Sequence, residues 1–245
     1  MFKLVLNWKM SRPNSDFKNY IKDLEHLVKN KKMNVILSPN YIDMDYIGRR
    51  INKVKLSAQN ISQYNEGPYT GEVSANFLKD KGVEYAIVGH SERRRLFNES
   101  SHSISKKAIT SLNNNIIPII CIGEYEEDYK KGLSSKILRE EIDLIKKDLK
   151  DNLDEVIFAY EPIWAVGNEL VFTDKEYQHI EKMLNIIKSE TKNNKIIYGG
   201  SVNESNVERL MSINAIKGFL VGGVSLDIKK LYKISDKIKG KINGN

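Results

Sequence analysis

Residues 195–225 read KIIYGGSVNESNVERLMSINAIKGFLVGGVS, and this stretch decides the fold. It contains two short apolar runs, 195–198 and 216–221, and each run ends in a glycine pair, Gly199-Gly200 or Gly222-Gly223. Short runs that are continuously apolar are typical of parallel strands buried on both faces. The stretch therefore predicts two parallel strands, each followed by a tight turn.

Six similar runs precede this stretch, which makes eight in the whole chain. They occupy residues 4–6, 35–37, 54–58, 85–88, 116–122 and 156–160. Between the runs, apolar residues recur at the spacing of a helix that buries one face. The clearest series are Ile21, Leu24 and Val28; Leu138, Ile142, Ile145 and Leu149; Tyr177, Ile180, Leu184 and Ile187; and Ile228, Leu231, Ile234 and Ile238. Thr173 and Glu176 form a capping box that predicts the start of the third of these helices.

Eight strand–helix units share the 245 residues of the chain, about 30 residues each, which is the size of a βα repeat. Parallel strands with helical crossovers form either an open doubly wound sheet or a closed barrel. The open sheet predicts a glycine-rich turn after the first strand, but residues 7–11 (Asn-Trp-Lys-Met-Ser) contain no glycine. The sequence therefore predicts an α/β fold, a single (β/α)8 TIM barrel, with residues 1–245 as one domain.

Composition excludes several classes of protein. Apolar residues make up 40% and charged residues 29% of the chain, as in globular proteins. No apolar run reaches the roughly 18 residues of a membrane span, and the N-terminus lacks the apolar core of a signal peptide. The single cysteine, Cys121, fits a reducing compartment. We therefore expect a cytoplasmic protein without a membrane partner.

The net charge of +7 leaves an alternative open, a non-enzymatic surface protein that binds polyanions. Basic residues are scattered along the chain, whereas nucleic-acid-binding proteins concentrate them on one segment or face. We therefore expect no specific nucleic-acid partner.

In a TIM barrel, function lies at the carboxyl ends of the strands. The two glycine pairs at the last two strand ends would expose backbone N–H groups, which bind phosphate in such barrels. Other strand ends carry polar side chains, namely Asn7, Lys9, Gln59, Asn60, His90, Glu124, Glu161 and Ser201.

Three of these side chains suit acid–base chemistry on an anion. His90 directly follows a strand and could act as an acid or electrophile, or be merely structural. Glu161 ends an apolar strand, where burial would make it a stronger base, or it could pair with a buried lysine. Lys9 would complement a phosphate or a developing oxyanion. No second His or Cys lies at ligand spacing from His90, so we expect no metal.

The other three histidines, His26, His102 and His179, lie among polar neighbours in helical stretches, and we expect them on the solvated surface. In contrast, residues 163–167 (Ile-Trp-Ala-Val-Gly) are apolar although they occupy a loop position. A lid that folds over a ligand would explain them, with Val166 and Leu220 pressing on the Glu161 carboxylate.

Six blocks of the sequence, spread over nearly the whole chain, resemble the triosephosphate isomerase family. The blocks are Asn7-Trp8-Lys9-Met10, Gly89-His90-Ser91-Glu92-Arg93-Arg94, Cys121-Ile122-Gly123-Glu124, Ala159 to Gly167, Tyr198-Gly199-Gly200-Ser201-Val202 and Gly218 to Gly223. The second and fourth blocks are highly specific.

The resemblance implies an enzyme of glycolysis and gluconeogenesis that interconverts dihydroxyacetone phosphate and D-glyceraldehyde 3-phosphate, without metal or cofactor. In that family a glutamate base acts beside a neutral histidine, which assigns Glu161 and His90. Lys9 would stabilise the enediolate. The remaining substrate-binding residues would be Asn7 and the amides of Gly167, Ser201, Gly222 and Gly223, under a lid from Pro162 to Phe172.

The resemblance also implies a homodimer, formed through the loop Asn65 to Glu72. Thr70 would lie near the partner's Lys9 site. The alternative for this loop alone is an ordinary turn, since Gly-Pro punctuates turns.

The chain departs from the family pattern in the lid and at the barrel mouth. Asn168-Glu169-Leu170 replaces the usual Thr-Gly-Lys, and we expect this change in hinge composition to alter kcat and KM together. Leu6, Ser11 and Val224 replace the usual glycine, asparagine and alanine, and we expect them to repack the mouth or the interior. Another phosphosugar isomerase, or an aldolase on the same barrel, remains an alternative enzyme.

Overall fold

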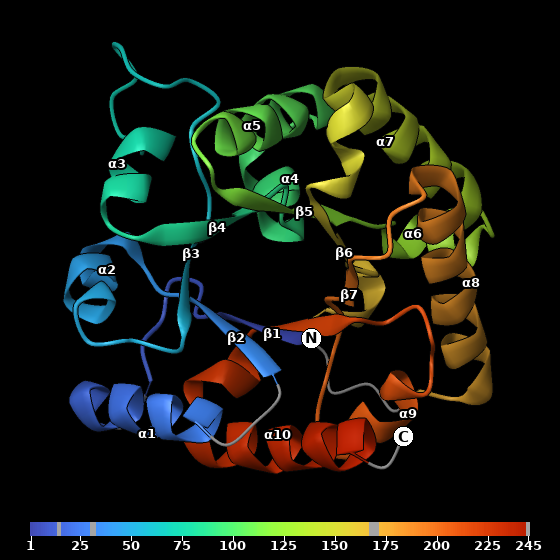
Figure 1. The fold of residues 1–245 in the computed structure, drawn as a ribbon. Helices are drawn as coiled ribbons and strands as arrows, with labels where there is room; N and C mark the ends of the chain where they lie inside the picture. The colour runs from blue at the N-terminus through green and yellow to red at the C-terminus, as the bar shows by residue number, and fades with distance from the viewer. Residues whose placement is uncertain (14–15, 30–32, 167–171, 244–245) are drawn as a thin grey trace.

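A computed structural model describes residues 1–13, 16–29, 33–166 and 172–243 (Figure 1). Eight parallel strands pair in chain order, and β8 pairs with β1, so the sheet closes into a barrel. All eight predicted runs are confirmed as strands. They are β1 (Phe2–Asn7), β2 (Met33–Ser38), β3 (Lys55–Ala58), β4 (Val83–Val88), β5 (Ile117–Ile122), β6 (Ile157–Tyr160), β7 (Ile196–Tyr198) and β8 (Gly218–Val221).

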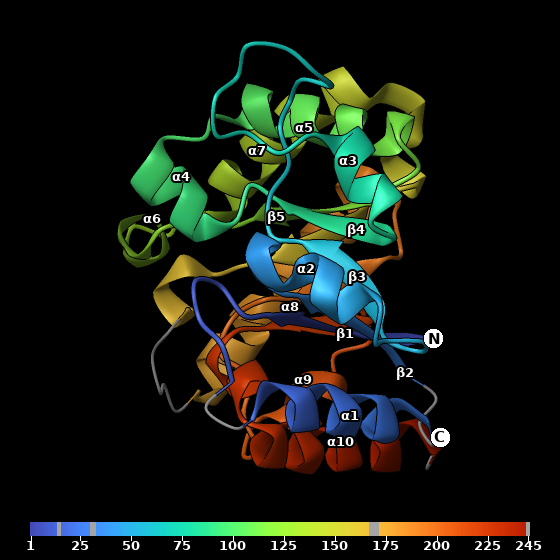
Figure 2. The ribbon, with the colours of Figure 1, turned by 90° about the vertical axis from the view of Figure 1, so that its left-hand side faces the viewer.

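Helices surround the barrel, and α1 and α10 lie side by side along one flank (Figure 2). The α-helices are α1 (Phe17–Lys29), α2 (Tyr41–Gly48), α3 (Ala75–Asp80), α4 (Ser91–Phe97), α5 (Ser101–Asn113), α6 (Glu126–Lys130), α7 (Ser134–Leu149), α8 (Asp174–Thr191), α9 (Val207–Met211) and α10 (Ile228–Asn243). Three short 3₁₀ helices are η1 (Lys150–Asp154), η2 (Ile163–Ala165) and η3 (Gly223–Leu226). No helix in these described ranges is both long enough and apolar enough to span a membrane.

The strands bury both faces because they separate two apolar layers. Alternate residues fill the barrel interior: Val5, Ile36, Tyr85, Ile87, Ile119, Cys121, Ile157, Ala159, Ile197 and Leu220. The opposite strand face packs against the predicted helix stripes, which are buried in α1, α7, α8 and α10 except for the partly exposed Ile228. The predicted capping box is confirmed, because the Thr173 N–H donates to Glu176 Oε2 at 2.8 Å at the start of α8.

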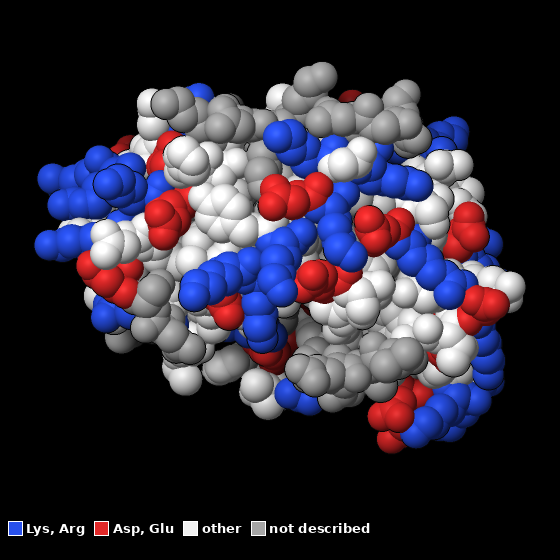
Figure 3. Space-filling view, turned by 90° about the horizontal axis from the view of Figure 1, so that it is seen from below, with Lys and Arg blue, Asp and Glu red and all other residues white. Residues whose placement is uncertain are grey.

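Charges of both signs alternate on the face viewed in Figure 3. On α10, two lysines pair with carboxylates of neighbouring segments: Lys233 with Glu204 at 3.1 Å and Lys237 with Glu208 at 3.3 Å. This mixed pattern differs from the continuous basic surface of a nucleic-acid-binding protein. The absence of a nucleic-acid partner stays a prediction.

Candidate functional site

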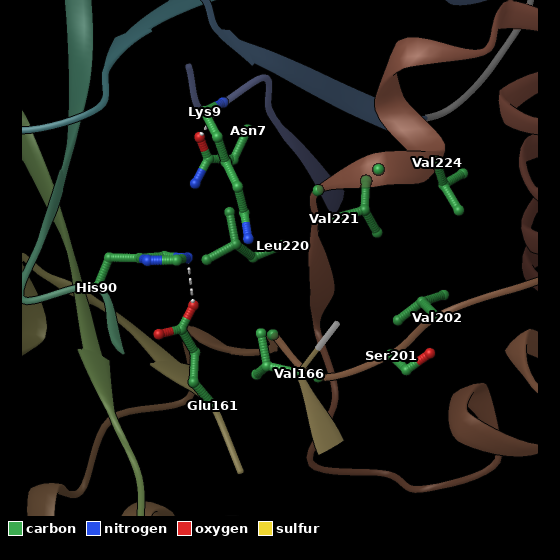
Figure 4. Close-up of a pocket in the computed structure, with 14 residues that line it drawn as sticks. Asn7, Lys9, His90, Glu161, Val166, Ser201, Val202, Leu220, Val221 and Val224 are labelled. Atoms are coloured by element: carbon green, nitrogen blue, oxygen red, sulfur yellow. Dashed lines mark hydrogen bonds and ion pairs between the residues drawn. The ribbon is translucent and has the colours of Figure 1, made fainter. Parts of the chain in front are cut away.

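A cavity of about 200 Å³ opens at the carboxyl ends of the strands (Figure 4). Its wall contains every predicted site residue in the described part of the chain: Asn7, Lys9, His90, Glu161, Ser201, Gly222 and Gly223. Gly167 and the replaced lid residues 168–170 lie outside the described residues. Val166 and Leu220 also line the cavity, as predicted for the apolar wall around the carboxylate.

Glu161 and His90 face each other across one side of the cavity (Figure 4). Glu161 Oε1 lies 3.2 Å from His90 Nε2, and Glu161 Oε2 accepts the backbone N–H of Ser91 at 2.9 Å. The Glu161 and His90 side chains are 3% and 8% exposed, so their interaction is shielded from water. Glu161 has therefore met a histidine and a backbone amide, rather than the buried lysine of the alternative interpretation.

The hydrogen bonds of His90 assign its tautomer. His90 caps α4, and its Nδ1 accepts the backbone N–H of Glu92 at 3.2 Å. A ring nitrogen that accepts a hydrogen bond carries no proton, so the proton lies on Nε2. His90 thus directs its Nε2–H into the cavity.

Lys9 has a left-handed backbone conformation (φ 53°), which is uncommon for a residue other than glycine. Hydrogen bonds to its backbone offset the cost of this conformation. Asn7 Oδ1 accepts the Lys9 N–H at 3.0 Å, and Gln59 Nε2 donates to the Lys9 carbonyl at 2.8 Å. The same Gln59 nitrogen donates to the Ser38 carbonyl at 3.0 Å and so ties Lys9 to the end of β2. Asn7 therefore holds Lys9 as well as facing the cavity.

The charge of Lys9 is held by Glu92 from α4. Lys9 Nζ donates to Glu92 Oε1 at 2.6 Å. Burial would raise the pKa of Glu92, but the hydrogen bond and charge of Lys9 outweigh it, so the pKa is lowered. Glu92 thus stays ionised and keeps the ammonium at the cavity mouth. The signal in the sequence is its place two residues after His90.

The backbone side of the cavity follows β7 and β8. The Ser201 N–H donates to the Ala165 carbonyl at 2.9 Å, so a phosphate would have to replace that carbonyl as its acceptor. The helix η3 begins at Gly223, and the first N–H groups of a helix have no partner within it. Val224, a departure from the family pattern, lines this side of the cavity, whereas Leu6 is fully buried in the outer core.

Arg94 connects three elements behind Glu161 and His90. Its guanidinium donates to the carbonyls of Gly89 and Cys121, each at 2.9 Å, and to Glu141 of α7 at 2.7 Å. Burial raises the pKa of Glu141 although Arg94 acts in the opposite direction. This link fixes the end of β4, which carries His90, against the end of β5.

The expectation that His179 lies on the solvated surface is wrong, while His26 and His102 are exposed as predicted. His179 Nε2 lies 2.9 Å from Glu124 Oε1, and the His179 side chain is only 17% exposed. Spacing within a helix could not reveal this contact, because Glu124 is 55 positions away in the segment that follows β5.

The geometry combines a buried carboxylate, an imidazole N–H donor, a cation and the glycine backbone that follows β8 in one small cavity. A carboxylate beside an N–H donor suits removal of a proton from a carbon next to a carbonyl, because the donor stabilises the charge that develops on oxygen. The described ranges contain no cluster of three His, Cys, Asp or Glu side chains placed to hold a metal.

The sequence model of the family described as "Triosephosphate isomerase" matches residues 2–238. A protein named triosephosphate isomerase from Mesomycoplasma hyorhinis is 37% identical over 238 residues, which cover 94% of this chain and 96% of the relative. One from Mesomycoplasma hyopneumoniae is 37% identical, covering 96% and 98% of the two chains. A third, from Clostridium botulinum, is 35% identical, covering 93% and 96%.

Proposed function

Because the chain belongs to the triosephosphate isomerase family, we propose that its cavity interconverts dihydroxyacetone phosphate and D-glyceraldehyde 3-phosphate with Glu161, His90 and Lys9 as the catalytic residues. The observation that carries these roles is the 3.2 Å approach of His90 Nε2 to Glu161 Oε1 inside a cavity that also contains Lys9. Glu161 removes a proton from the carbon beside the carbonyl and returns it to the adjacent carbon.

His90 supports this proton transfer from the oxygen side. When substrate binds, the carbonyl oxygen replaces Glu161 as the acceptor of the Nε2–H, which frees the carboxylate to reach the carbon. The developing enediolate is then stabilised by the imidazole N–H and by the Lys9 ammonium. A neutral donor suits this step because it polarises the carbonyl without first surrendering a proton to the base.

The phosphate occupies the backbone side of the cavity. We assign it to the amides of Gly222, Gly223 and Ser201, with Gly167 under a lid from Pro162 to Phe172. The lid and Gly167 stay predictions, since residues 167–171 lie outside the described ranges. Exclusion of water by such a lid would protect the enediolate from loss of phosphate.

The test is turnover of both triose phosphates, with exchange of the substrate carbon-bound hydrogen in D₂O. We expect turnover by the unmodified chain and a loss of roughly 10²–10⁴-fold in kcat in Glu161→Gln, because general-base catalysis is removed. Well-folded protein without turnover would contradict the substrate assignment. A steep salt dependence of polyanion binding without turnover would instead favour the polyanion-binding alternative.

A homodimer is the second part of the proposal. A cavity of about 620 Å³ adjoins the first and shares Asn7, Lys9 and His90 with it. Apolar side chains stand exposed around it, with Met10 98% and Phe97 63% exposed, as in the core of an interface. We propose that the loop Asn65 to Glu72 of a second copy enters this cavity and brings Thr70 close to Lys9.

Sedimentation velocity tests the dimer directly. Within the loop, Tyr69 stacks on Tyr64, which precedes it, with ring centroids 3.9 Å apart. Phe97→Asp should give monomers with reduced turnover, whereas Leu144→Asp, at an exposed leucine on α7, should leave the dimer intact. A monomeric unmodified chain with full activity would contradict this arrangement.

We further propose that the chain is one domain over residues 1–245 and that it resides in the cytoplasm. A single cysteine, buried in the barrel interior, supports a reducing compartment. Fractionation of cells of the source organism checks the location.

A further inference from the structure

The indole of Trp164 contacts side chains from α6, from α8 and from the segment that follows β5, and it does not line the catalytic cavity. We propose that Glu124, Tyr129 and His179, here called the Trp164 anchor, are positioning residues that hold segment 161–166 in its catalytic position. The inference rests on the proposed function, because that segment begins with the proposed base.

Glu124 is the centre of the anchor. Its carboxylate is fully buried and accepts side-chain donors from three directions: Tyr160 Oη at 3.1 Å, Trp164 Nε1 at 2.9 Å and His179 Nε2 at 2.9 Å. A buried carboxylate requires such donors to offset the loss of water. Burial would raise the pKa of Glu124, but the hydrogen bonds from His179 and Trp164 outweigh it, so the pKa is lowered. The carboxylate therefore stays an acceptor for the indole.

Aromatic contacts fix the plane of the indole. Tyr129 of α6 stacks on Trp164 with ring centroids 4.4 Å apart and an angle of 16°. His179 of α8 meets both rings edge-on, at 4.8 Å from Tyr129 and 5.9 Å from Trp164. Tyr129 Oη also donates to Glu176 Oε1 at 3.4 Å. The anchor thus joins Trp164 to the first turns of α8.

The anchored segment touches both sides of the catalytic cavity. The Glu124 carbonyl accepts the Ile163 N–H at 3.1 Å, so Glu124 holds the segment through its backbone as well as its side chain. Trp164 follows Glu161 by three residues, and the Ala165 carbonyl accepts the Ser201 N–H. Movement of Trp164 would therefore shift the proposed base and change the availability of the Ser201 amide.

His179 is the member of the anchor that can be tested most cleanly. A carboxylate only accepts hydrogen bonds, so His179 Nε2 must donate to Glu124. His179→Leu removes the donor while retaining an apolar side chain, whereas His179→Gln retains an N–H donor. His102→Leu is a matched control, because it removes a histidine whose side chain is 68% exposed on α5.

Three measurements separate positioning from general stability. Tryptophan emission and acrylamide quenching report the indole, since the chain has two tryptophans and Trp164→Phe gives the contribution of Trp8. Steady-state kinetics give kcat and KM separately. Inhibition by inorganic phosphate reports the phosphate subsite without any chemical step.

We expect His179→Leu to increase quenching of Trp164, to lower kcat about tenfold and to weaken phosphate inhibition a few-fold, because a loosened hinge changes kcat and KM together. His179→Gln should recover most of each loss, and His102→Leu should match the unmodified chain. Tyr129→Leu should reproduce the quenching change, whereas Tyr129→Phe, which retains the stacked ring, should not.

The proposal is overturned if folded His179→Leu matches His102→Leu in all three measurements, or if His179→Leu and His179→Gln lose kcat equally. If His179→Leu does not fold, the two Tyr129 variants decide in the same way, and equal quenching in both overturns the anchor. Absence of turnover in the unmodified chain would reject the proposed function instead, while quenching and phosphate binding would still report the anchor.

Discussion

The two sides of the cavity differ in the kind of group that they present: one side presents side chains, and the other presents backbone. After β4 and β6, His90 and Glu161 are side chains held by hydrogen bonds from their neighbours. After β7 and β8, the proposed phosphate site consists of backbone at Ser201, Gly222 and Gly223, and the two glycines have no side chain that would cover their amides. Proton transfer at the first side depends on two side chains and their hydrogen bonds. Phosphate binding at the second side depends on glycines that have no side chain.

Gly199 joins the two sides, because a Cβ added there would lie 2.8 Å from Glu161 Cγ. Because Gly199 has no side chain, it leaves room for the Glu161 side chain on the other side of the cavity. Substitutions at both sides can test how far this division holds.

The largest effect is expected for Glu161→Asp. The shorter side chain withdraws the carboxylate from the carbon, so kcat should fall by about two to four orders of magnitude. Kinetics in both directions and circular dichroism measure activity and folding. Glu140→Asp, at an exposed position on α7, is the matched control. Near-normal activity in folded Glu161→Asp would remove Glu161 from its role as the base.

Gly199→Ala should have the next largest effect. The new methyl group must displace Glu161, and a shift near 1 Å costs about a hundredfold in rate. We expect the loss mainly in kcat, with a smaller change in inhibition by inorganic phosphate. Gly240→Ala, where a Cβ meets nothing within 4 Å, controls for the substitution itself. A loss confined to KM would show that Gly199 serves the phosphate rather than the base.

The two glycines after β8 should differ from each other. A Cβ at Gly222 would lie 3.2 Å from Lys9 Cε, so Lys9 must yield by a few tenths of an ångström. We expect KM to rise about three- to tenfold in Gly222→Ala, because the displacement is small. At Gly223 a Cβ would meet nothing within 4 Å, so the rise in KM for Gly223→Ala should be smaller. The reverse order would show that contact with Lys9 does not determine binding here.

The smallest effect concerns acid stability. The pKa of buried Glu124 is lowered from 4.5, because hydrogen bonds from His179 and Trp164 outweigh burial. Its ionised form therefore stabilises the fold above about pH 4.5, and this contribution is lost as the pH falls through the lowered pKa. Urea unfolding at several pH values should show a shallower loss of unfolding free energy below pH 4.5 in Glu124→Gln than in the unmodified chain. The same slope in both would show that Glu124 does not contribute to the acid limb.

The sequence predicts the barrel and the side-chain side of the cavity for a simple reason. An apolar run followed by a polar residue marks a strand end, and strand ends converge in a closed parallel barrel, so His90, Glu161 and Lys9 had to meet. Both the type and the position of these residues are visible in the chain.

Contacts between distant elements could not be predicted in this way. The stripe in α8 predicts which face of that helix is buried, but it does not predict that His179 meets Glu124. The left-handed backbone at Lys9 and the bond from the Ser201 N–H to Ala165 depend on partners brought close only by folding. The residues of a site can thus be predicted from the sequence, whereas the hydrogen bonds that orient them cannot.

The buried thiol of Cys121 can report how often the barrel opens. The thiol lies in the barrel interior at 1% exposure, and burial raises its pKa well above the ordinary value. Alkylating reagents attack only an accessible thiolate, so the closed barrel protects this sulfur. The rate at which a dilute alkylating reagent labels Cys121 therefore reports how often the barrel strands separate enough to expose the thiol. A ligand that binds at the barrel mouth and stabilises the closed barrel would lower this labelling rate, so its binding can be followed without measuring turnover.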